Sequence, residues 1–462
     1  MTATNPTRPR LLYLAFYFPP SRASGVHRAR ATANHFVAAG WDVTVLAAPL
    51  PFLYDVIGSV DEKLVETVDP RITVERPDLN LYRWTYDLRE MSWFRGTLPT
   101  VAERLFIWRE EKQFPEPYVS WARSAVARAL KLHRREKFDA VLATGNPFSA
   151  FAAAWLTGKL ARIPYVIDYR DSWTLDLFTD GPAFPPKHPA WKWERRLIGK
   201  SAATVFVNNA LREWHAQRYP DAADRMLVVP NGWDPDLLEI DVAEPASAAI
   251  DSSQRPLQFG YLGTITAKQP VEEMAAAFEI ARRHPDLAGA ELNIHAHLGF
   301  FQHSHTWFLR RLGLDAHGRV DPALDTGVRL RGPVPKTEVS SVYSGNDVLV
   351  FLAGGGRYVT SGKIFEYMAS GRPIVSVHAP DIAAREVLEG YPLWFTADSL
   401  DVDQVAQSFI EAGKAARDAS PELRAAARRH ASKYQRDILL APFEDAMRSM
   451  VRRPLPAPGS TS

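Results

Sequence analysis

The sequence predicts an α/β protein made of two Rossmann-like, doubly wound halves. Short apolar runs typical of buried parallel strands alternate with helical segments, and this alternation occurs in two series along the 462 residues. A stretch containing Pro, Ala and Ser at 234–256 separates the series and predicts a linker. We expect an N-terminal domain at 1–234, a C-terminal domain at 235–435, a helix at 436–452 that crosses back to the first domain, and a disordered tail at 453–462.

The first series begins with a βαβ unit. Residues 11–17 predict a strand, 26–39 a helix that ends at Gly40, and 41–47 the next strand. Further strands are predicted at 138–143, 164–168, 203–207 and 226–229, with a helix up to 160. The second series predicts strands at 257–262, 291–296, 328–330, 347–352, 373–377 and 393–396, and helices at 271–283, 336–343, 363–369, 382–388 and 402–415.

Composition excludes several classes of protein. The chain has no cysteine, which excludes disulfides, thiolate metal ligands and a cysteine nucleophile. A formal net charge of +2 gives no case for nucleic-acid binding, and no apolar run is long enough to predict a membrane span. No G-x-G-x-x-G follows the first strand and no Walker motif occurs, which disfavours dehydrogenases and P-loop enzymes. The polar N-terminus lacks the apolar core of a signal peptide. We expect a cytoplasmic protein, with attachment to the cytoplasmic face of a membrane left open.

The segment 361–375 predicts a short helix, a glycine stop and a strand. Ser361 is a suitable N-cap, and Gly371 lies where a helix ends. Ile364 can face the core, and Glu366 lies next to the same apolar face. The carboxylate of Glu366 then either pairs weakly with Lys363 or binds two ligand hydroxyls, such as those of a ribose.

A glycine-rich loop follows the strand predicted at 347–352. Bare backbone amides, a cation and a nearby helix start can cradle a diphosphate, with Lys268 and Lys363 as additional charges. The alternative is a flexible glycine turn without a ligand. The loop consists of Gly354, Gly355, Gly356 and Arg357.

Charged and aromatic residues follow the strand predicted at 164–168. Ligands of open α/β sheets bind outside the carboxyl ends of the strands, so these residues are candidates for a site. Asp168 or Asp171 could bind an acceptor hydroxyl and assist its deprotonation, and Tyr169 and Trp173 could form an aromatic wall against a sugar. Alternatively, Arg170 only neutralises one of the carboxylates.

The sequence gives no convincing metal site. Two D-x-D patterns, at 234–236 and 401–403, are better explained by a linker and by helix capping. His295 and His297 alternate on one predicted strand, where a satisfied polar pair is favoured over a metal site. We therefore expect no metal and no cofactor other than substrates.

The stretch 81–110 is rich in aromatic and basic side chains. Trp84, Trp93, Phe94 and Trp108 are interleaved with arginines, a combination that suits a lipid headgroup interface. The alternative is a loop and helix that pack on their own domain.

Several short motifs, taken in order along nearly the whole chain, resemble family 4 glycosyltransferases, which are retaining enzymes of the GT-B architecture. The resemblance covers about residues 10–445. The motifs are Phe18-Pro19-Pro20 through Ser24-Gly25 with Arg28, then 40–45, 166–173, 229–234, 260–263 and 363–373.

The resemblance implies the GT-B fold and a nucleotide-sugar donor held by the C-terminal half. Glu366 would bind the ribose, Lys268 the diphosphate, and Gly25 would allow close approach of the donor phosphate or the acceptor. Asp171 would lie on the acceptor side. With the loop chemistry above, the expected donor-binding residues are Gly263, Thr264, Lys268, Gly355, Gly356, Arg357, Lys363, Ile364 and Glu366. The expected acceptor-side or phosphate-loop residues are Ser24, Gly25, Arg28, Tyr169, Arg170 and Trp173, and the expected catalytic residues are Asp168, Asp171 and Lys268.

Two positions depart from the family pattern. Tyr358 stands where the family often has a glutamate directed at the transferred sugar, and Thr264 lies near the position of a frequent arginine. The expected function is retaining, metal-independent sugar transfer to a small-molecule, lipid-linked or glycan acceptor, in the synthesis of a polysaccharide, glycolipid or glycosylated metabolite. A nucleotide-sugar epimerase and a non-catalytic nucleotide-sugar-binding or pathway-assembly protein remain as alternatives.

Overall fold

The computed structural model describes most of the chain as two compact units. Unit 1 contains the described residues of 1–176, 182–229 and 440–462, and unit 2 contains those of 177–181 and 230–439. The described residues are 8–81, 92–111, 116–177, 179–238, 255–265, 268–298, 309–310, 312, 314–315, 319, 326–334, 338–354 and 356–452.

Unit 1 contains a seven-stranded parallel sheet in the order β3-β2-β1-β4-β5-β8-β9. The strand order reverses between β1 and β4, which makes their carboxyl ends a topological switch point. The strands are β1 (Arg10–Leu14), β2 (Asp42–Leu46), β3 (Thr73–Glu75), β4 (Ala140–Thr144), β5 (Tyr165–Tyr169), β8 (Ala203–Phe206) and β9 (Met226–Val228), with a separate pair β6 (Leu175–Asp176) and β7 (Gly181–Pro182).

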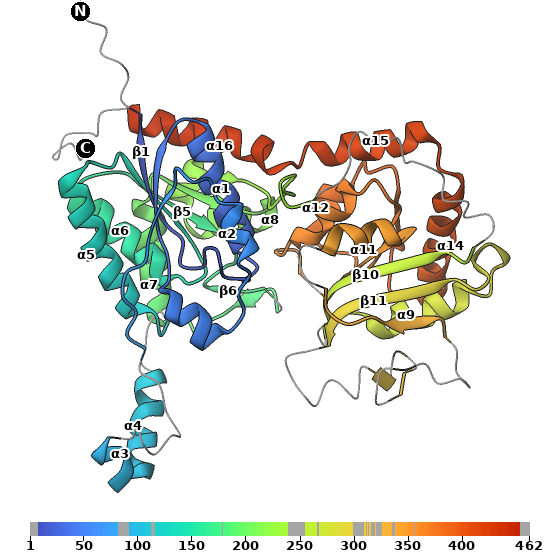
Figure 1. Ribbon diagram of the computed structural model, residues 1–462, viewed down its shortest axis with the longest axis horizontal. Coiled ribbons are helices and arrows are strands. Elements are labelled where there is room, and N and C mark those ends of the chain that lie inside the picture. The colour runs from blue at the N-terminus through green and yellow to red at the C-terminus, as the bar shows by residue number, and fades with distance from the viewer. Residues whose placement is uncertain are drawn as a thin grey trace, which may run out of the picture. The chain divides into compact units, whose positions relative to one another are not determined.

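Helices connect these strands, as the βα pattern requires (Figure 1). The last helix, α16 (Arg436–Arg452), belongs to unit 1 from Leu440 onward. There Phe443 contacts Phe36, and Arg448 donates to the Ala39 carbonyl at 2.7 Å. The other helices of unit 1 are α1 (Val26–Ala38), α2 (Lys63–Glu66), α3 (Trp93–Thr97), α4 (Pro99–Glu111), α5 (Val119–Arg135), α6 (Ser149–Ala161), α7 (Pro189–Lys200) and α8 (Asn209–Arg218), with short turns η1 (Phe52–Ile57) and η2 (Pro220–Arg225).

Unit 2 contains a six-stranded parallel sheet in the order β12-β11-β10-β13-β14-β15. Its switch point lies between β10 and β13. The strands are β10 (Gln258–Ile265), β11 (Glu291–Leu298), β12 (Val328–Leu330), β13 (Val348–Ala353), β14 (Ile374–His378) and β15 (Trp394–Thr396). The helices are α9 (Val271–Ala281), η3 (Pro285–Leu287), α11 (Val339–Gly345), α12 (Gly362–Ala369), α13 (Ala384–Leu388), α14 (Val402–Asp418) and α15 (Pro421–Ser432).

The sheet of unit 2 is covered on both faces. Its central strand, β13, is apolar at every position, so both of its faces can be buried. Along β13, Val348 and Val350 enter one core with residues of α9 and α14. Leu349 and Phe351 enter a second core with residues of α11, α12, α13 and α15. This alternation follows from the two-residue period of a strand, and it explains why a continuous apolar run predicts a buried parallel strand.

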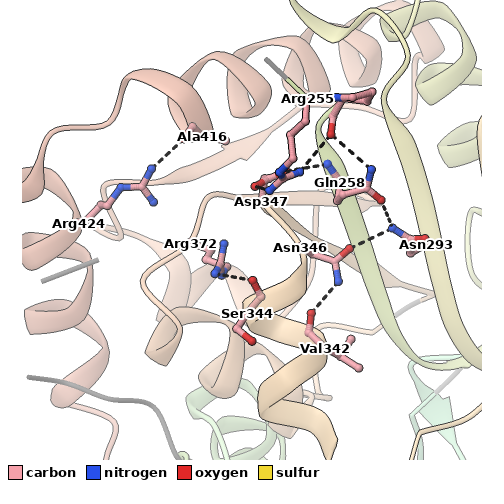
Figure 2. A network of polar contacts seen from close by, with 11 residues as sticks. Arg255, Gln258, Asn293, Val342, Ser344, Asn346, Asp347, Arg372, Ala416 and Arg424 are labelled. Carbon is pink, nitrogen blue, oxygen red and sulfur yellow. Dashed lines mark hydrogen bonds and ion pairs between the residues drawn. The ribbon is translucent and has the colours of Figure 1, made fainter. Parts of the chain in front are cut away.

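A polar network joins the amino ends of the central strands of unit 2 (Figure 2). Arg255 forms a bidentate ion pair with Asp347 at 2.7 and 2.9 Å, and the amide of Gln258 donates to the same carboxylate at 2.8 Å. The side chain of Asn346 lies so close to β10 that a Cβ on Gly260 would be 2.4 Å from the Cγ of Asn346. Close packing at the amino ends of the strands therefore requires glycine at position 260.

The fold class predicted from sequence is confirmed, with shifts of a few residues at several elements. The helix predicted at 336–343 is α11, at 339–345 among the described residues, and the helix predicted at 402–415 extends to Asp418 in α14. The helices α2, α5, α7, α8 and α15 and the strands β3, β6 and β7 were not predicted. Most of the predicted linker and the whole predicted tail lie outside the described residues. None of the helices that the structure describes is both long enough and apolar enough to cross a bilayer.

Candidate functional site

A cavity of about 310 Å³ opens in unit 2 at the carboxyl ends of β10 and β13. This is the switch point of the sheet, where ligands of doubly wound folds bind. Backbone, apolar side chains and the two cations Lys268 and Lys363 line the cavity. The polar and glycine residues that line it include Gly263, Thr264, Lys268, Gly354, Ser361 and Lys363.

Helix α12 begins at this cavity. The side chain of Ser361 accepts from the amide of Lys363 at 3.4 Å, so the predicted N-cap is confirmed. Gly371 has φ +69°, a left-handed conformation that favours glycine after a helix end. Lys363 thus stands in the first turn of a helix, where the helix dipole and its own charge both favour an anion.

The glycine loop after β13 approaches the loop after β10 at van der Waals distance. A Cβ on Gly354 would lie 2.6 Å from the carbonyl carbon of Lys268, so only glycine allows this approach. Gly356 has φ +98°. Arg357 lies with its guanidinium 5.4 Å from the ring centre of Tyr358, and Gly355 lies outside the described residues.

Glu366 is half-buried on α12, and its carboxylate accepts a hydrogen bond from the Tyr343 hydroxyl at 2.8 Å. Tyr343 is buried, and burial together with the charge of Glu366 raises its pKa well above the usual value. The hydroxyl therefore remains protonated and donates. Tyr343 was not predicted from the sequence as a partner of Glu366.

The predicted donor-binding residues divide into two groups. Gly263, Thr264, Lys268 and Lys363 line the cavity. The Ile364 side chain is fully buried among apolar side chains, on the core face predicted for it, and it does not line the cavity. The helical period directs it to the core face of α12. The residues that do not line this cavity are Gly356, Arg357, Ile364 and Glu366.

Asp168 and Arg28 form a buried ion pair at the carboxyl end of β5 in unit 1. Arg28 donates to both carboxylate oxygens, at 2.9 and 2.8 Å, and these side chains are only 5% and 4% exposed. Thr144 donates to the same carboxylate at 3.2 Å, and Arg28 also donates to the Val229 carbonyl at 3.0 Å. The cation that neutralises Asp168 is thus Arg28.

Arg170 pairs with its neighbour Asp171 at 3.2 Å, so the expected neutralisation of one of the two carboxylates by Arg170 is seen at Asp171. The Asp171 side chain is 42% exposed, so its carboxylate remains accessible to a ligand. Gly25 precedes α1, and a Cβ there would lie 1.4 Å from Nη1 of Arg170. The glycine therefore leaves room for a guanidinium in unit 1, while the preceding Ser24 is exposed.

The prediction that Tyr169 and Trp173 form an aromatic wall against a sugar is wrong, because both side chains are buried. Tyr169 is completely buried, because it ends β5 with its ring against Phe151 and Phe206. Trp173 is 6% exposed and stacks on Phe148 at 5.5 Å. Both rings support the loop from within rather than facing a ligand.

A buried carboxylate beneath this loop was missed. Glu194 of α7 is fully buried and accepts from the hydroxyls of Tyr169, Thr174 and Tyr219 at 3.1, 2.6 and 2.7 Å. Burial alone would raise the pKa of Glu194, but His215 and the bonded hydroxyls lower it below the usual value. One signal was available, because Glu194 shares a helix face with Ala190, Leu197 and Ile198, all buried.

The two D-x-D patterns have local roles. Asp401 caps α14 by accepting from the amide of Gln404 at 3.0 Å, as predicted, and Asp234 accepts from the amide of Asp236 at 3.1 Å. Burial lowers the pKa of His295, as does the nearby Arg331. Across the residues that the structure describes, no three His, Asp or Glu side chains gather as a metal site.

The aromatic stretch is exposed where the structure describes it. Trp93 and Phe94 on α3 are 82% and 38% exposed, and Leu98, Val101 and Leu105 beside and on α4 are 48–53% exposed. Figure 1 draws these two short helices in cyan. The alternative in which these side chains pack on their own domain does not hold for them. Residues 82–91, which include Trp84, and the Trp108 side chain are outside the described part.

Comparison with known proteins supports the fold-level resemblance. A family model described as a glycosyl transferase 4-like domain matches residues 25–232. No curated protein sequence matches the chain. A glycosyltransferase from Rickettsia africae is 11% identical with a TM-score of 0.63, covering 97% of this chain and 100% of that one.

Two further solved structures are similar over almost their whole length. Anabaena HepE, in complex with UDP and glucose, is 14% identical with a TM-score of 0.58, covering 96% of this chain and 100% of its own. A putative UDP-N-acetylglucosamine 2-epimerase from Listeria monocytogenes is 11% identical with a TM-score of 0.53, covering 96% of each chain. At these identities the similarity establishes the fold. The chain thus has the GT-B fold, and its residues 25–232 match the model of a glycosyl transferase 4-like domain.

Proposed function

We propose that this protein transfers a sugar from a nucleotide-sugar donor to an acceptor hydroxyl with retention of anomeric configuration. The observation that carries the proposal is the cavity of unit 2, where Lys268, Lys363 and the start of α12 surround a space beside glycine backbone. Two ammonium groups and helix amides are the chemistry that holds a diphosphate. The UDP seen in complex with Anabaena HepE makes UDP-sugars the first donors to test.

The proposed reaction needs no protein nucleophile. Lys268 and Lys363 stabilise the negative charge that develops as the diphosphate leaves, and electrostatic stabilisation of this kind supplies much of the barrier lowering. The departing phosphate oxygen takes the proton of an acceptor that arrives on the same face, which gives retention. No step requires a metal ion, so chelation of divalent cations should leave turnover unchanged.

Unit 1 is proposed to bind the acceptor. Asp171 carries an accessible carboxylate and is the candidate group for the acceptor hydroxyl. Asp168 acts indirectly. Its ion pair with Arg28 fixes the end of β5, and the loop that carries Asp171 starts there. The acceptor class that we propose is a small-molecule, lipid-linked or glycan hydroxyl, in the synthesis of a polysaccharide, glycolipid or glycosylated metabolite.

Two other functions use the same donor cavity. A nucleotide-sugar epimerase is favoured by the similar Listeria structure, and a non-catalytic binding protein is favoured by Tyr358 at the position of the family glutamate. An epimerase converts the donor without an acceptor. A binding protein neither transfers nor hydrolyses the sugar across a panel of donors.

The test is a thermal-shift screen of the full chain against UDP-, GDP-, dTDP- and ADP-sugars, followed by product analysis with the best donor. Lys363→Ala should reduce the shift strongly, because a charge-assisted contact to phosphate contributes about 1.5–3 kcal/mol. Lys414→Ala is the control, since Lys414 lies on the exposed side of unit 2 beside Asp286. No stabilisation by any donor would contradict the proposal.

We also propose that α3 and α4 attach the protein to the surface of an anionic bilayer. Exposed Trp93, Phe94 and Leu98 offer apolar area, and Arg95 on α3 and Arg104 on α4 supply positive charge for lipid phosphates. The full chain should co-sediment with vesicles containing anionic lipid, less so in high salt. Trp93→Ala should weaken this binding, whereas Leu160→Ala, at an exposed position on α6, should not. Absence of sedimentation would favour a soluble partner.

A further inference from the structure

The hydroxyl of Tyr343 reaches the carboxylate of Glu366 from a neighbouring helix. Tyr343 lies on α11 and Glu366 on α12, and the hydroxyl donates to Oε2 at 2.8 Å. Tyr343 is 2% exposed, whereas Glu366 is only half-buried. A buried donor thus reaches a carboxylate at the boundary with solvent.

This hydrogen bond has a fixed direction. Because the tyrosine keeps its proton, it can only donate to the ionised carboxylate, which accepts. A hydrogen bond to a charged group is stronger than a neutral one, and it holds the flexible glutamate side chain in one orientation.

The same pair is tied to the cavity of unit 2. Tyr367, next to Glu366 on α12, accepts from the amide of Leu262 at 3.0 Å and donates to its carbonyl at 3.2 Å. Leu262 and Tyr367 both line the cavity. The rings of Tyr343 and Tyr367 meet edge to face at 5.3 Å. Through Tyr367, the helix that carries Glu366 is therefore fixed to the strand end that lines the cavity.

We propose that Tyr343 is a positioning residue that holds Glu366 to accept the hydroxyls of a nucleotide ribose, and so makes the site select ribonucleotides over 2′-deoxyribonucleotides. This inference rests on the proposed donor site. A carboxylate held at one oxygen loses less freedom when it accepts from a ribose, and the 2′-hydroxyl is the group that distinguishes the two nucleotide classes.

The experiment measures binding by calorimetry, using the full chain with UDP, GDP and ADP and with dUDP, dGDP and dADP. The wild type should bind the preferred ribonucleoside diphosphate roughly tenfold more tightly than its 2′-deoxy counterpart, as expected for a hydroxyl that bonds to a charged group. Tyr343→Phe keeps the buried ring and removes only the hydroxyl. It should lower affinity for the ribonucleotide by several-fold and leave affinity for the deoxynucleotide nearly unchanged, so that discrimination shrinks.

Tyr391→Phe is the matched control. Tyr391 is also buried, and its hydroxyl donates to the carbonyls of Arg372 and Met368 at 2.8 and 3.3 Å near the other end of α12. This variant loses an equivalent hydroxyl and should keep the full ratio of ribose to deoxyribose binding. An equal loss of discrimination in both variants would assign the effect to helix stability and overturn the inference.

Glu366→Gln provides a second variant at a half-exposed position. It should lose discrimination by itself, and adding Tyr343→Phe should then change the ratio little, because the two residues act through one interaction. If the wild type binds and discriminates but Tyr343→Phe retains the full ratio, Tyr343 is not the positioning residue and the donor site stands. If the wild type binds none of these nucleotides, both proposals fail.

Discussion

The buried pair of Arg28 and Asp168 provides a quantitative test of how the loop after β5 is held. We consider replacing Asp168 by Leu, replacing Arg28 by Met, and combining the two changes. Each single change leaves the other charge in a site where both side chains are about 95% covered. A buried ion that loses its partner destabilises a protein by about 3–5 kcal/mol.

The double variant should be destabilised by much less than the two single variants added together. It removes both charges and leaves two weaker deficits, the hydroxyl of Thr144 and the carbonyl of Val229, which lose their hydrogen bonds to the pair. Unsatisfied neutral groups of this kind cost about 1–3 kcal/mol. The double-mutant cycle should therefore show a coupling of several kcal/mol between the two residues.

Hydrogen exchange of the amides in β5 measures the opening of unit 1 by itself, which is necessary because a two-unit chain need not unfold in one step. Either single change should reduce protection roughly a hundredfold or more, since about 1.4 kcal/mol corresponds to a factor of ten. The matched control is Glu75→Gln, which breaks the bidentate pair with Arg128. Those side chains are 26% and 30% exposed, so we expect a loss of about 1 kcal/mol or less.

Two results would refute this reasoning. If Asp168→Leu and Glu75→Gln reduced protection equally, burial would not set the strength of the Arg28 pair. If the double variant lost as much as the two single variants together, the charges would not be coupled, and Asp168 would be left without its proposed supporting role.

Two further predictions concern the missed carboxylate and the glycine loop. Because contacts lower the pKa of Glu194, the stability that its ionised form contributes is present above its unfolded pKa of about 4.3 and is lost as pH falls further. Glu194→Gln should thus destabilise unit 1 at pH 7 and make less difference near pH 3, as measured by exchange at both pH values. Gly354→Ala should weaken nucleotide binding at least tenfold in calorimetry, because its Cβ would displace the backbone of Lys268, while Gly345→Ala, with no atom within 4 Å of its Cβ, should not.

Short-range patterns predicted the strands and helix α12 well. Apolar runs identify buried strands because both faces of each sheet are covered, and Ser361 and Gly371 delimit α12 by local hydrogen bonding and backbone conformation. Lys268 and Lys363 could be predicted as cavity residues because Lys268 follows β10 and Lys363 lies in the first turn of α12, both at the carboxyl edge of the sheet.

The pairing of charged groups could not be predicted in this way. Arg28 reaches Asp168 across 140 positions, and Tyr343 reaches Glu366 across 23, so no local spacing signals either contact. Tyr169 was misassigned because successive side chains at the end of a strand point to opposite faces of the sheet. A side chain there can therefore be buried under helices although its neighbours are near a ligand. Which of them faces inward depends on the layer of helices, and in this protein Glu194 of that layer binds the Tyr169 hydroxyl.

The central claim is that unit 2 holds a nucleoside diphosphate at the carboxyl ends of β10 and β13. Hydrogen exchange of the full chain, with and without a saturating UDP-, GDP-, dTDP- or ADP-sugar, tests it most directly. We expect at least one donor to slow exchange in residues 261–265 and 361–369, and Lys363→Ala to abolish this protection. A donor that binds tightly but protects only other segments, or a complete panel without protection there, would contradict the account.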